Sequence, residues 1–154
     1  MFSSSSATNS DSVAGLLAES FSMLSREVPE SFARMCARLE GKAVWIEVDE
    51  ERFVVEVRGG SALVRAQGPG AEGEAAGGAA SIATSKRAIC DVIDARTSLA
   101  DAVIADEVRA VAPLARLVDV LGGLSMYVHG AVRCPSFPRL LERFRALSAA
   151  AAGA

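Results

Sequence analysis

The sequence predicts an α+β fold, in which helices cover one face of a mostly antiparallel five-stranded sheet. Apolar residues recur at helical spacing between residues 13 and 39, and the period switches to two from Ala43 onward. From residue 79 to residue 147, helical patterns alternate with short strand-like segments. The chain has 154 residues, which is enough for a single domain with a substantial core.

The first part of the folded chain predicts two helices, after a Ser-rich start at residues 1–9 that we expect to be disordered. Ser10 or Asp11 can cap the first helix, and Pro29 suits the first turn of the second. Gly41 can end the second helix. The apolar positions of the two helices are Val13, Leu16, Leu17, Phe21, Leu24, Phe32, Met35, Cys36 and Leu39.

Three strands follow, at residues 43–48, 53–58 and 62–66. Val44, Ile46 and Val48 share one face of the first strand, as expected for a sheet that is buried on one side only. Gly59 and Gly60 supply the positive φ angles that a two-residue hairpin requires. These segments predict an antiparallel meander.

The next segment, residues 67–78, is a flexible loop by composition. Residues 68–73 match G-x-G-x-x-G, the spacing of a dinucleotide-binding turn. That turn needs a helix N-terminus at the glycines, whereas here Pro69 removes a donor and Glu72 and Glu74 repel phosphate. We therefore interpret the segment as a loop.

The second half predicts a strand at residues 79–84, helices at 86–94 and 98–105, and a strand at 107–111. Pro113 begins a long helix, in which Gly122-Gly123 predicts a bend or close packing. Its apolar stripe comprises Leu114, Leu117, Val118, Leu121, Leu124 and Val128. Pro135 separates a last helix, whose apolar residues are Phe137, Leu140, Leu141, Phe144 and Leu147. We expect one domain over residues 10–148, with a helical extension from about residue 123 and a frayed Ala-rich tail at 149–154.

Composition narrows the function classes. The net charge of −3 and the pI near 5.2 give no overall attraction to nucleic acid. Cys36, Cys90 and Cys134 are odd in number and form no C-x-x-C pair, which favours a reducing compartment. The first residues lack an apolar signal region, and no apolar run is long enough for a membrane span. We expect a soluble, cytoplasmic protein.

Few residues suggest catalysis or metal binding. His129, the sole histidine, lies near Tyr127 and Cys134 and could act as a base, although a lone histidine at a helix end more often packs or caps. One histidine and three scattered cysteines do not have the spacing of a zinc site. A small enzyme that uses Tyr127 and His129 on an apolar substrate stays as an alternative.

A cluster of arginines marks the C-terminal helix. Arg139, Arg143 and Arg145 are accompanied only by Glu142. A solvated outer face is the simpler interpretation. The alternative is a docking surface for a membrane or a protein partner, and a homodimer contact by the same extension is left open.

Two segments carry a resemblance to a known family. ARLEGKAVWIEVDEERFVVEVRGG and ATSKRAICDVIDARTSLADAVIADEVRAVAPLARLVDVL together resemble the sterol carrier protein type 2 (SCP2) family of lipid-binding domains. Ala95 and Asp106 stand where that family usually has glycine, and Ala112 stands where it has a Gly-Asp pair. The matching residues are Leu39, Gly41, Thr84, Ser85, Asp94, Arg96, Ser98, Leu99 and Ala102.

The resemblance implies an apolar tunnel between sheet and helices that binds fatty acyl chains, sterols or similar lipids, without a cofactor or shared catalytic residues. The function it implies is non-enzymatic lipid binding or transfer. The alternative from another class is an accessory or oligomerisation domain that binds a protein partner. Ordinary core packing is the competing interpretation at every candidate lining position. The candidates are Phe32, Met35, Ile89, Val92, Ile93, Leu99, Val103, Leu117, Leu121 and Leu124.

Overall fold

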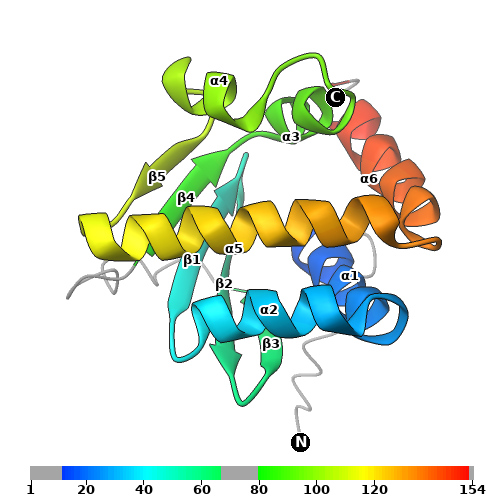
Figure 1. The fold of residues 1–154 in the computed structure, drawn as a ribbon. Coiled ribbons are helices and arrows are strands. Elements are labelled where there is room, and N and C mark those ends of the chain that lie inside the picture. The colour runs from blue at the N-terminus through cyan, green and yellow to red at the C-terminus, as the bar shows by residue number, and fades with distance from the viewer. Residues whose placement is uncertain (1–11, 67–79, 153–154) are drawn as a thin grey trace, which may run out of the picture.

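The structure, a computed structural model, describes residues 12–66 and 80–152. The helices in these ranges are α1 (Val13–Glu27), α2 (Pro29–Leu39), α3 (Lys86–Ile93), α4 (Leu99–Ile104), α5 (Leu114–Arg133) and α6 (Phe137–Ala152). The strands are β1 (Ala43–Val48), β2 (Glu51–Arg58), β3 (Ser61–Ala66), β4 (Ala80–Thr84) and β5 (Arg109–Val111). The order of elements follows the prediction (Figure 1).

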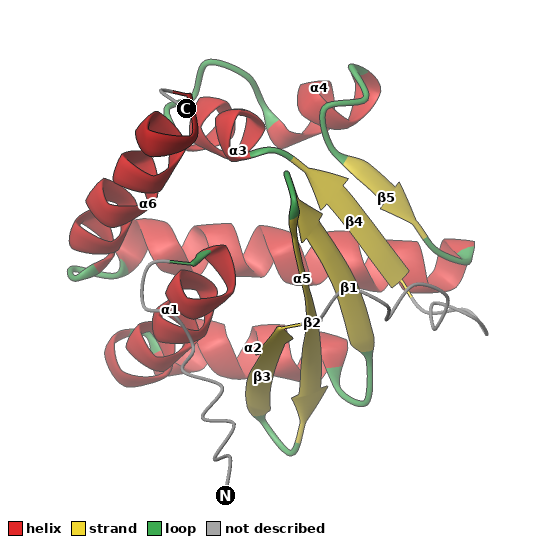
Figure 2. Cartoon of the chain, turned by 180° about the vertical axis from the view of Figure 1, so that it is seen from behind, coloured by secondary structure: helices red, strands yellow, loops and turns green. Residues whose placement is uncertain are grey.

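The five strands form one sheet in the order β3-β2-β1-β4-β5. β1 and β4 are parallel, and the other three pairs are antiparallel. The described helices lie on one face of the sheet or beyond its ends, and none of them crosses the other face (Figure 2). The predicted α+β class, with a mostly antiparallel sheet and helices on one side, is therefore confirmed.

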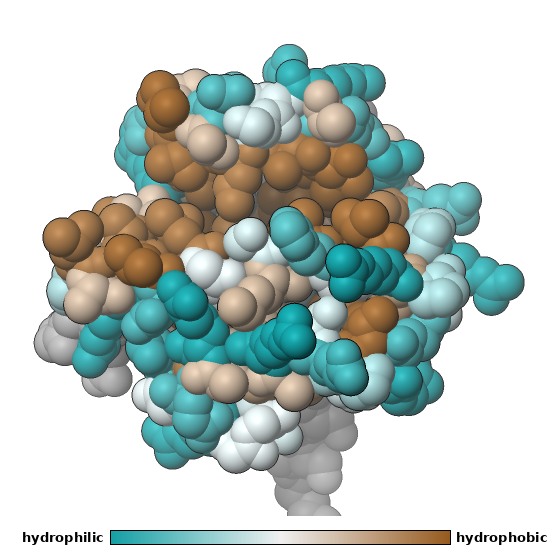
Figure 3. Space-filling model, viewed as in Figure 1, coloured by the Kyte–Doolittle hydropathy of each residue, from teal (hydrophilic) through white to brown (hydrophobic). Residues whose placement is uncertain are grey.

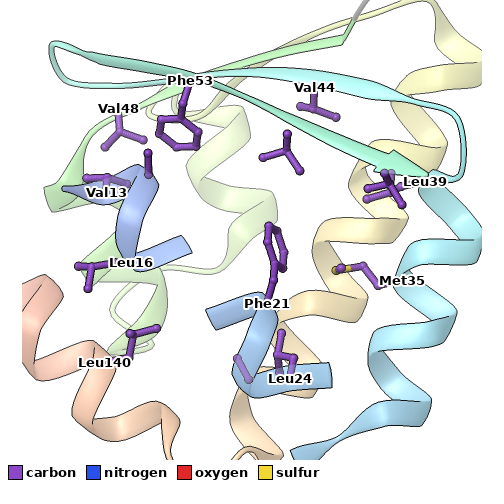
Figure 4. Close-up of a cluster of buried hydrophobic side chains, with 14 of the residues drawn as sticks. Val13, Leu16, Phe21, Leu24, Met35, Leu39, Val44, Val48, Phe53 and Leu140 are labelled. Carbon is purple, nitrogen blue, oxygen red and sulfur yellow. The ribbon is translucent and has the colours of Figure 1, made fainter. Parts of the chain in front are cut away.

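The core fills the space between the sheet and α1, α2 and α6. Phe53 and Val48 point from the sheet toward α1, and Leu140 reaches the same cluster from α6 (Figure 4). Phe53 and Leu24 are each only 1% exposed. The period-two pattern of β2 places Phe53 on the covered face, while Arg52 pairs with Glu47 of β1 on the open face.

Two helix boundaries differ from the prediction by a few residues. The cap of α1 is Ser12, whose Oγ accepts from the Gly15 N–H at 3.0 Å, so the prediction of Ser10 or Asp11 was wrong by one or two residues. α6 continues to Ala152, past residue 149 where fraying was predicted. The predicted disordered start and the residues 67–78 that contain G-x-G-x-x-G lie outside the described residues.

α5 packs differently from the prediction. Its buried residues are Val120, Gly123, Gly130 and Ala131, not the leucine-rich stripe. The helix lies against α2 through this face of mostly small residues, since glycine permits a close approach of two backbones. Three members of the predicted stripe, Leu114, Val118 and Val128, are exposed instead.

Two of the departures from the SCP2 pattern occur at left-handed backbone positions. Ala95 has φ +56° and Asp106 has φ +63°. Both adopt the conformation that glycine takes without steric cost. The turns after α3 and α4 therefore keep the geometry expected of the usual glycines, with some strain at Ala95.

Candidate functional site

α3 and α4 are held by the edge of the sheet and by α6. Ser85 caps α3, directly after β4. Thr84 Oγ1 donates to the carbonyl of Glu107 at 3.0 Å, which fastens the return from α4 to the end of β4. Arg145 of α6 pairs with Asp94 at the end of α3. These contacts fix both helices beyond one end of the sheet.

α5 is held instead by α2. Asp119 forms ion pairs with Arg38 Nε at 3.3 Å and with Lys42 Nζ at 3.5 Å. A Cβ atom on Gly123 would lie 2.7 Å from the side chain of Leu39. Because α5 and the α3–α4 pair have different main neighbours, a strip of surface is left between them.

Large aliphatic side chains border this strip and remain partly exposed. Figure 3 shows apolar side chains along both sides of a hollow between α5 and the α3–α4 pair. None of them reaches the burial of the core beneath α1 and α2. We name this feature the apolar groove. The aliphatic sequence candidates on these three helices that remain partly exposed are Val92, Ile93, Leu99, Val103, Leu117, Leu121 and Leu124. That they line the groove stays a prediction.

The ten lining candidates from the sequence fall into two places. Seven of them are the partly exposed residues just given, and Ile89 of α3 packs against the core. Met35 is 2% exposed within the core, and Phe32 stacks with Phe21, with ring centroids 6.3 Å apart. The candidates of α3, α4 and α5 thus belong to the helices that border the groove, and their contact with a ligand stays a prediction, whereas Phe32 and Met35 lie in the α1–α2 layer.

Several exposed aliphatic residues beside the groove were not among the candidates. The sequence assigned Leu114, Val118 and Val128 to the packing stripe of α5, but they are 78%, 54% and 38% exposed. Gly123 and Gly130, seven residues apart, were the available signal. Small residues at that spacing mark a close helix contact and place the larger residues on another side.

Tyr127 and His129 do not meet. Residues that are two positions apart in a helix, as these are, point in directions about 200° apart around its axis. Tyr127 is half-buried against the core, where its hydroxyl donates to Ser20 Oγ at 2.7 Å, and Ser20 Oγ donates to the carbonyl of Leu17 at 2.6 Å. Burial raises the pKa of Tyr127 to about 12. His129 is exposed, so the geometry gives no support to an enzyme that uses both.

Cys134 is also engaged in structure. Its Sγ lies 3.5 Å from Glu27 Oε2, and the other oxygen of that carboxylate accepts from Ser136 N at 3.1 Å and Ser136 Oγ at 3.0 Å. Burial, the hydrogen bond to Glu27 and its negative charge raise the pKa of Cys134. A protonated, buried thiol is a poor nucleophile.

A second hollow, of about 570 Å³, lies at the start of α3 and is polar. Arg109 and Asp106 pair within it at 2.6 Å, and Arg87, Asp91 and Glu107 add one positive and two negative charges. Charges of both signs in nearly equal number give little net attraction to an anion or a cation. The hollow is lined by Ala83, Thr84, Ser85, Arg87, Ala88, Asp91, Asp106, Glu107 and Arg109.

The C-terminal arginines are partly used within the chain. Arg143 Nη1 contacts both oxygens of Glu19 at 2.9 and 2.7 Å, and Arg145 pairs with Asp94. Arg139 is exposed. A membrane or protein contact through these residues stays a prediction.

The described residues contain no group of three or more His, Cys, Asp or Glu side chains placed to hold a metal ion. None of their helices is both long and apolar enough to cross a membrane.

Comparison with known proteins finds similarity among solved structures. No protein-family model matches the sequence, and no curated protein matches it. Among solved structures, the chain is similar to a structure titled "UbiJ-SCP2 Ubiquinone synthesis protein", with a TM-score of 0.54 and 15% identity. The match covers 76% of this chain and 88% of the other.

The chain has the SCP2 fold. The resemblance first noted in the hairpin and in the α3–α4 segment is thereby confirmed at the level of the fold. At 15% identity the match concerns architecture alone. Within the SCP2 fold of this chain, the apolar groove is the feature whose chemistry is most distinct from an ordinary surface.

Proposed function

We propose that the chain binds an apolar, lipid-like ligand in the groove between α5 and the α3–α4 pair, without covalent chemistry. The observation that supports this is the partial exposure of seven large aliphatic residues on three helices, in a chain whose other core is closely packed. Contiguous apolar surface of this kind is rare on monomers unless it serves binding.

The driving force would be the removal of apolar surface from water. Each buried methylene contributes about 0.8 kcal/mol. No charged side chain is among the seven groove residues, so the groove favours the hydrocarbon part of a ligand and leaves a polar head group outside. Fatty acyl chains, sterols and isoprenoid chains fit this chemistry.

The similar structure suggests which class to test beside fatty acids. Its title calls it a ubiquinone synthesis protein. A polyprenyl quinone carries a long apolar tail on a polar ring, and we include it in the proposed ligand class. Transfer of such a ligand between carriers would require only binding and release.

The experiment combines two measurements on the purified full chain. Organic extraction followed by mass spectrometry should recover co-purified lipid, and a fluorescent fatty acid and a polyprenyl quinone should compete for one site. Val92→Glu and Val103→Glu place a charge among half-exposed groove residues and should weaken uptake at least about tenfold. Leu63→Glu, at a 62% exposed position on β3, is the matched control.

Two results would reject the proposal. One is the absence of co-purified lipid together with no uptake of either probe. The other is uptake that is unchanged in both groove variants while circular dichroism shows them folded. A loss of uptake in Leu63→Glu as well would show that binding is not specific to the groove.

A further inference from the structure

The outer face of α5 carries a regular, mostly apolar pattern that a ligand in the groove would cover only near its middle. Positions 114, 118, 121, 125, 128 and 132 alternate in steps of four and three residues. This is the spacing of the seam along which two helices pack. We name it the α5 seam, and its residues are Leu114, Val118, Leu121, Ser125, Val128 and Val132.

The exposure of the seam distinguishes it from the groove. Leu114 and Val132 lie at opposite ends of α5, about 27 Å apart at 1.5 Å per residue. They are also its most exposed members, at 78% and 82%. A ligand between α5 and the α3–α4 pair would cover residues near the middle of the helix but not both ends. A second helix lying along α5 covers both.

We propose that the α5 seam pairs with the α5 seam of a second copy, antiparallel, about a twofold axis at the level of residue 123. This axis places Leu114 against Val132 and Val118 against Val128 of the other copy, so that aliphatic side chains meet aliphatic side chains. The same surface then serves both partners, as a closed twofold dimer requires.

The charges near the seam agree with an antiparallel arrangement. The seam itself contains no ionisable residue. In a parallel pair Arg116, Asp119 and Arg133 would each lie level with their own copies, and like charges would approach one another. The antiparallel axis instead sets these positions level with residues 130, 127 and 113, which are uncharged, and it also aligns the two helix dipoles favourably.

A small residue on the other flank of the seam also permits a close approach. The exposed Ala115 lies one position after Leu114, where a bulky side chain would hold the helices apart. Val111, 67% exposed at the end of β5, extends the apolar surface beyond Leu114. A single helix pair is small beside the roughly 800 Å² per partner of a stable interface, so we expect a micromolar dissociation constant.

This dimer does not depend on the proposed lipid function, and the test uses other residues. Analytical ultracentrifugation of the full chain over a range of concentrations should show a monomer–dimer equilibrium. Val118→Lys and Val128→Glu should each raise the dissociation constant about 100-fold, because a charge is placed against an aliphatic partner. Leu63→Glu, on β3, should not change it.

The double variant tests the antiparallel register. In one chain that carries Val118→Lys and Val128→Glu, each new lysine meets a glutamate of the other copy, and dimerisation should recover at least about tenfold over either single variant. A parallel pair would set lysine against lysine, and no recovery would occur.

Three outcomes would overturn the proposal. They are a chain that is monomeric at millimolar concentration, single variants that dimerise like the parent, and a double variant without recovery. A monomeric chain that floats with phosphatidylcholine vesicles, and loses this in Val118→Lys, would assign the face to a bilayer instead. Both substituted positions are partly exposed, and circular dichroism confirms that the variants fold.

Discussion

The two sides of the molecule use apolar residues differently. Beneath β1 and β2, α1 and α2 enclose a core in which Phe53, Leu24 and Cys36 are each 1% exposed. On the α3–α4 side of α5, the described aliphatic residues are covered less completely, and Leu121 and Val103 remain half-buried. The two sides differ in how far neighbouring elements cover their apolar residues. We call the α1–α2 side the sealed side and the α3–α4 side the open side.

The difference is explained by the helix contacts. α5 approaches α2 through Gly123 and Gly130, whereas Leu114, Val118 and Val128 remain exposed. α3 and α4 are fastened to β4 and α6 and do not move over to cover them. The sealed side therefore provides stability, and the open side provides the surface for the proposed binding.

The largest expected effect is a core truncation on the sealed side. Phe53→Ala should lower the free energy of unfolding by about 3–5 kcal/mol, since the ring is fully enclosed and leaves a cavity. Val103→Ala on the open side should cost less than about 1 kcal/mol, because the side chain is already partly hydrated. Urea unfolding measures both. Equal losses would show that the α3–α4 side is as tightly packed as the core.

The contact between α2 and α5 gives a second contrast. Gly123→Ala should cost about 1–3 kcal/mol, because its Cβ would lie 2.7 Å from the Leu39 side chain in a packed interface. At Gly122 the nearest atoms, at 3.0 Å, belong to the flexible Arg38 side chain. Gly122→Ala should therefore be close to neutral, as alanine also gains helix propensity. Thermal unfolding of the two variants decides, and the reverse order would contradict the packing of α5 on α2.

The packing of α5 also shows what could and could not be predicted from the sequence. Period and turn chemistry were enough to predict β1 to the residue and both glycines of the hairpin, because these features are local. They could not identify the packing face of α5. A wide apolar stripe and a narrow stripe of small residues occur on one helix, and only the position of α2 determines which one is buried.

The candidate site shows a similar limit. All ten lining candidates were chosen from the sequence pattern alone, and their contact with a ligand stays a prediction. The structure buries Met35 in the core and packs Phe32 against Phe21. Periodicity reveals that a face is apolar, but it does not distinguish a face covered by protein from one left open for a ligand.

A smaller effect is expected at the turn after α3, on the open side. Ala95 has φ +56°, so Ala95→Gly should relieve left-handed strain and raise the free energy of unfolding by up to about 1 kcal/mol. Ala33, exposed within α2, is the control, since Ala33→Gly should lower it by about 1 kcal/mol. Chemical denaturation of both variants measures the difference. If both substitutions destabilise equally, the turn is not strained.

The smallest effect concerns the junction between the two sides, where Glu27 of α1 holds the turn into α6. Partial burial raises its pKa, but the hydrogen bonds from Ser136 and Cys134 outweigh burial and leave the pKa below the ordinary value of 4.5. A carboxyl with a depressed pKa in the folded state stabilises the fold fully above its unfolded pKa. This contribution is lost as pH falls through the folded pKa.

Glu27→Gln should therefore reduce stability at neutral pH and leave it nearly unchanged in acid, below the folded pKa of Glu27. Urea midpoints of the parent and the variant, measured from neutral pH downward, should converge below pH 4.5. Glu142→Gln, at an exposed position on α6, supplies the comparison and should leave the two curves parallel. A constant gap between the parent and Glu27→Gln at every pH would show that the carboxylate charge is not what holds the turn. The α1–α6 junction would then depend on packing around Phe137 instead.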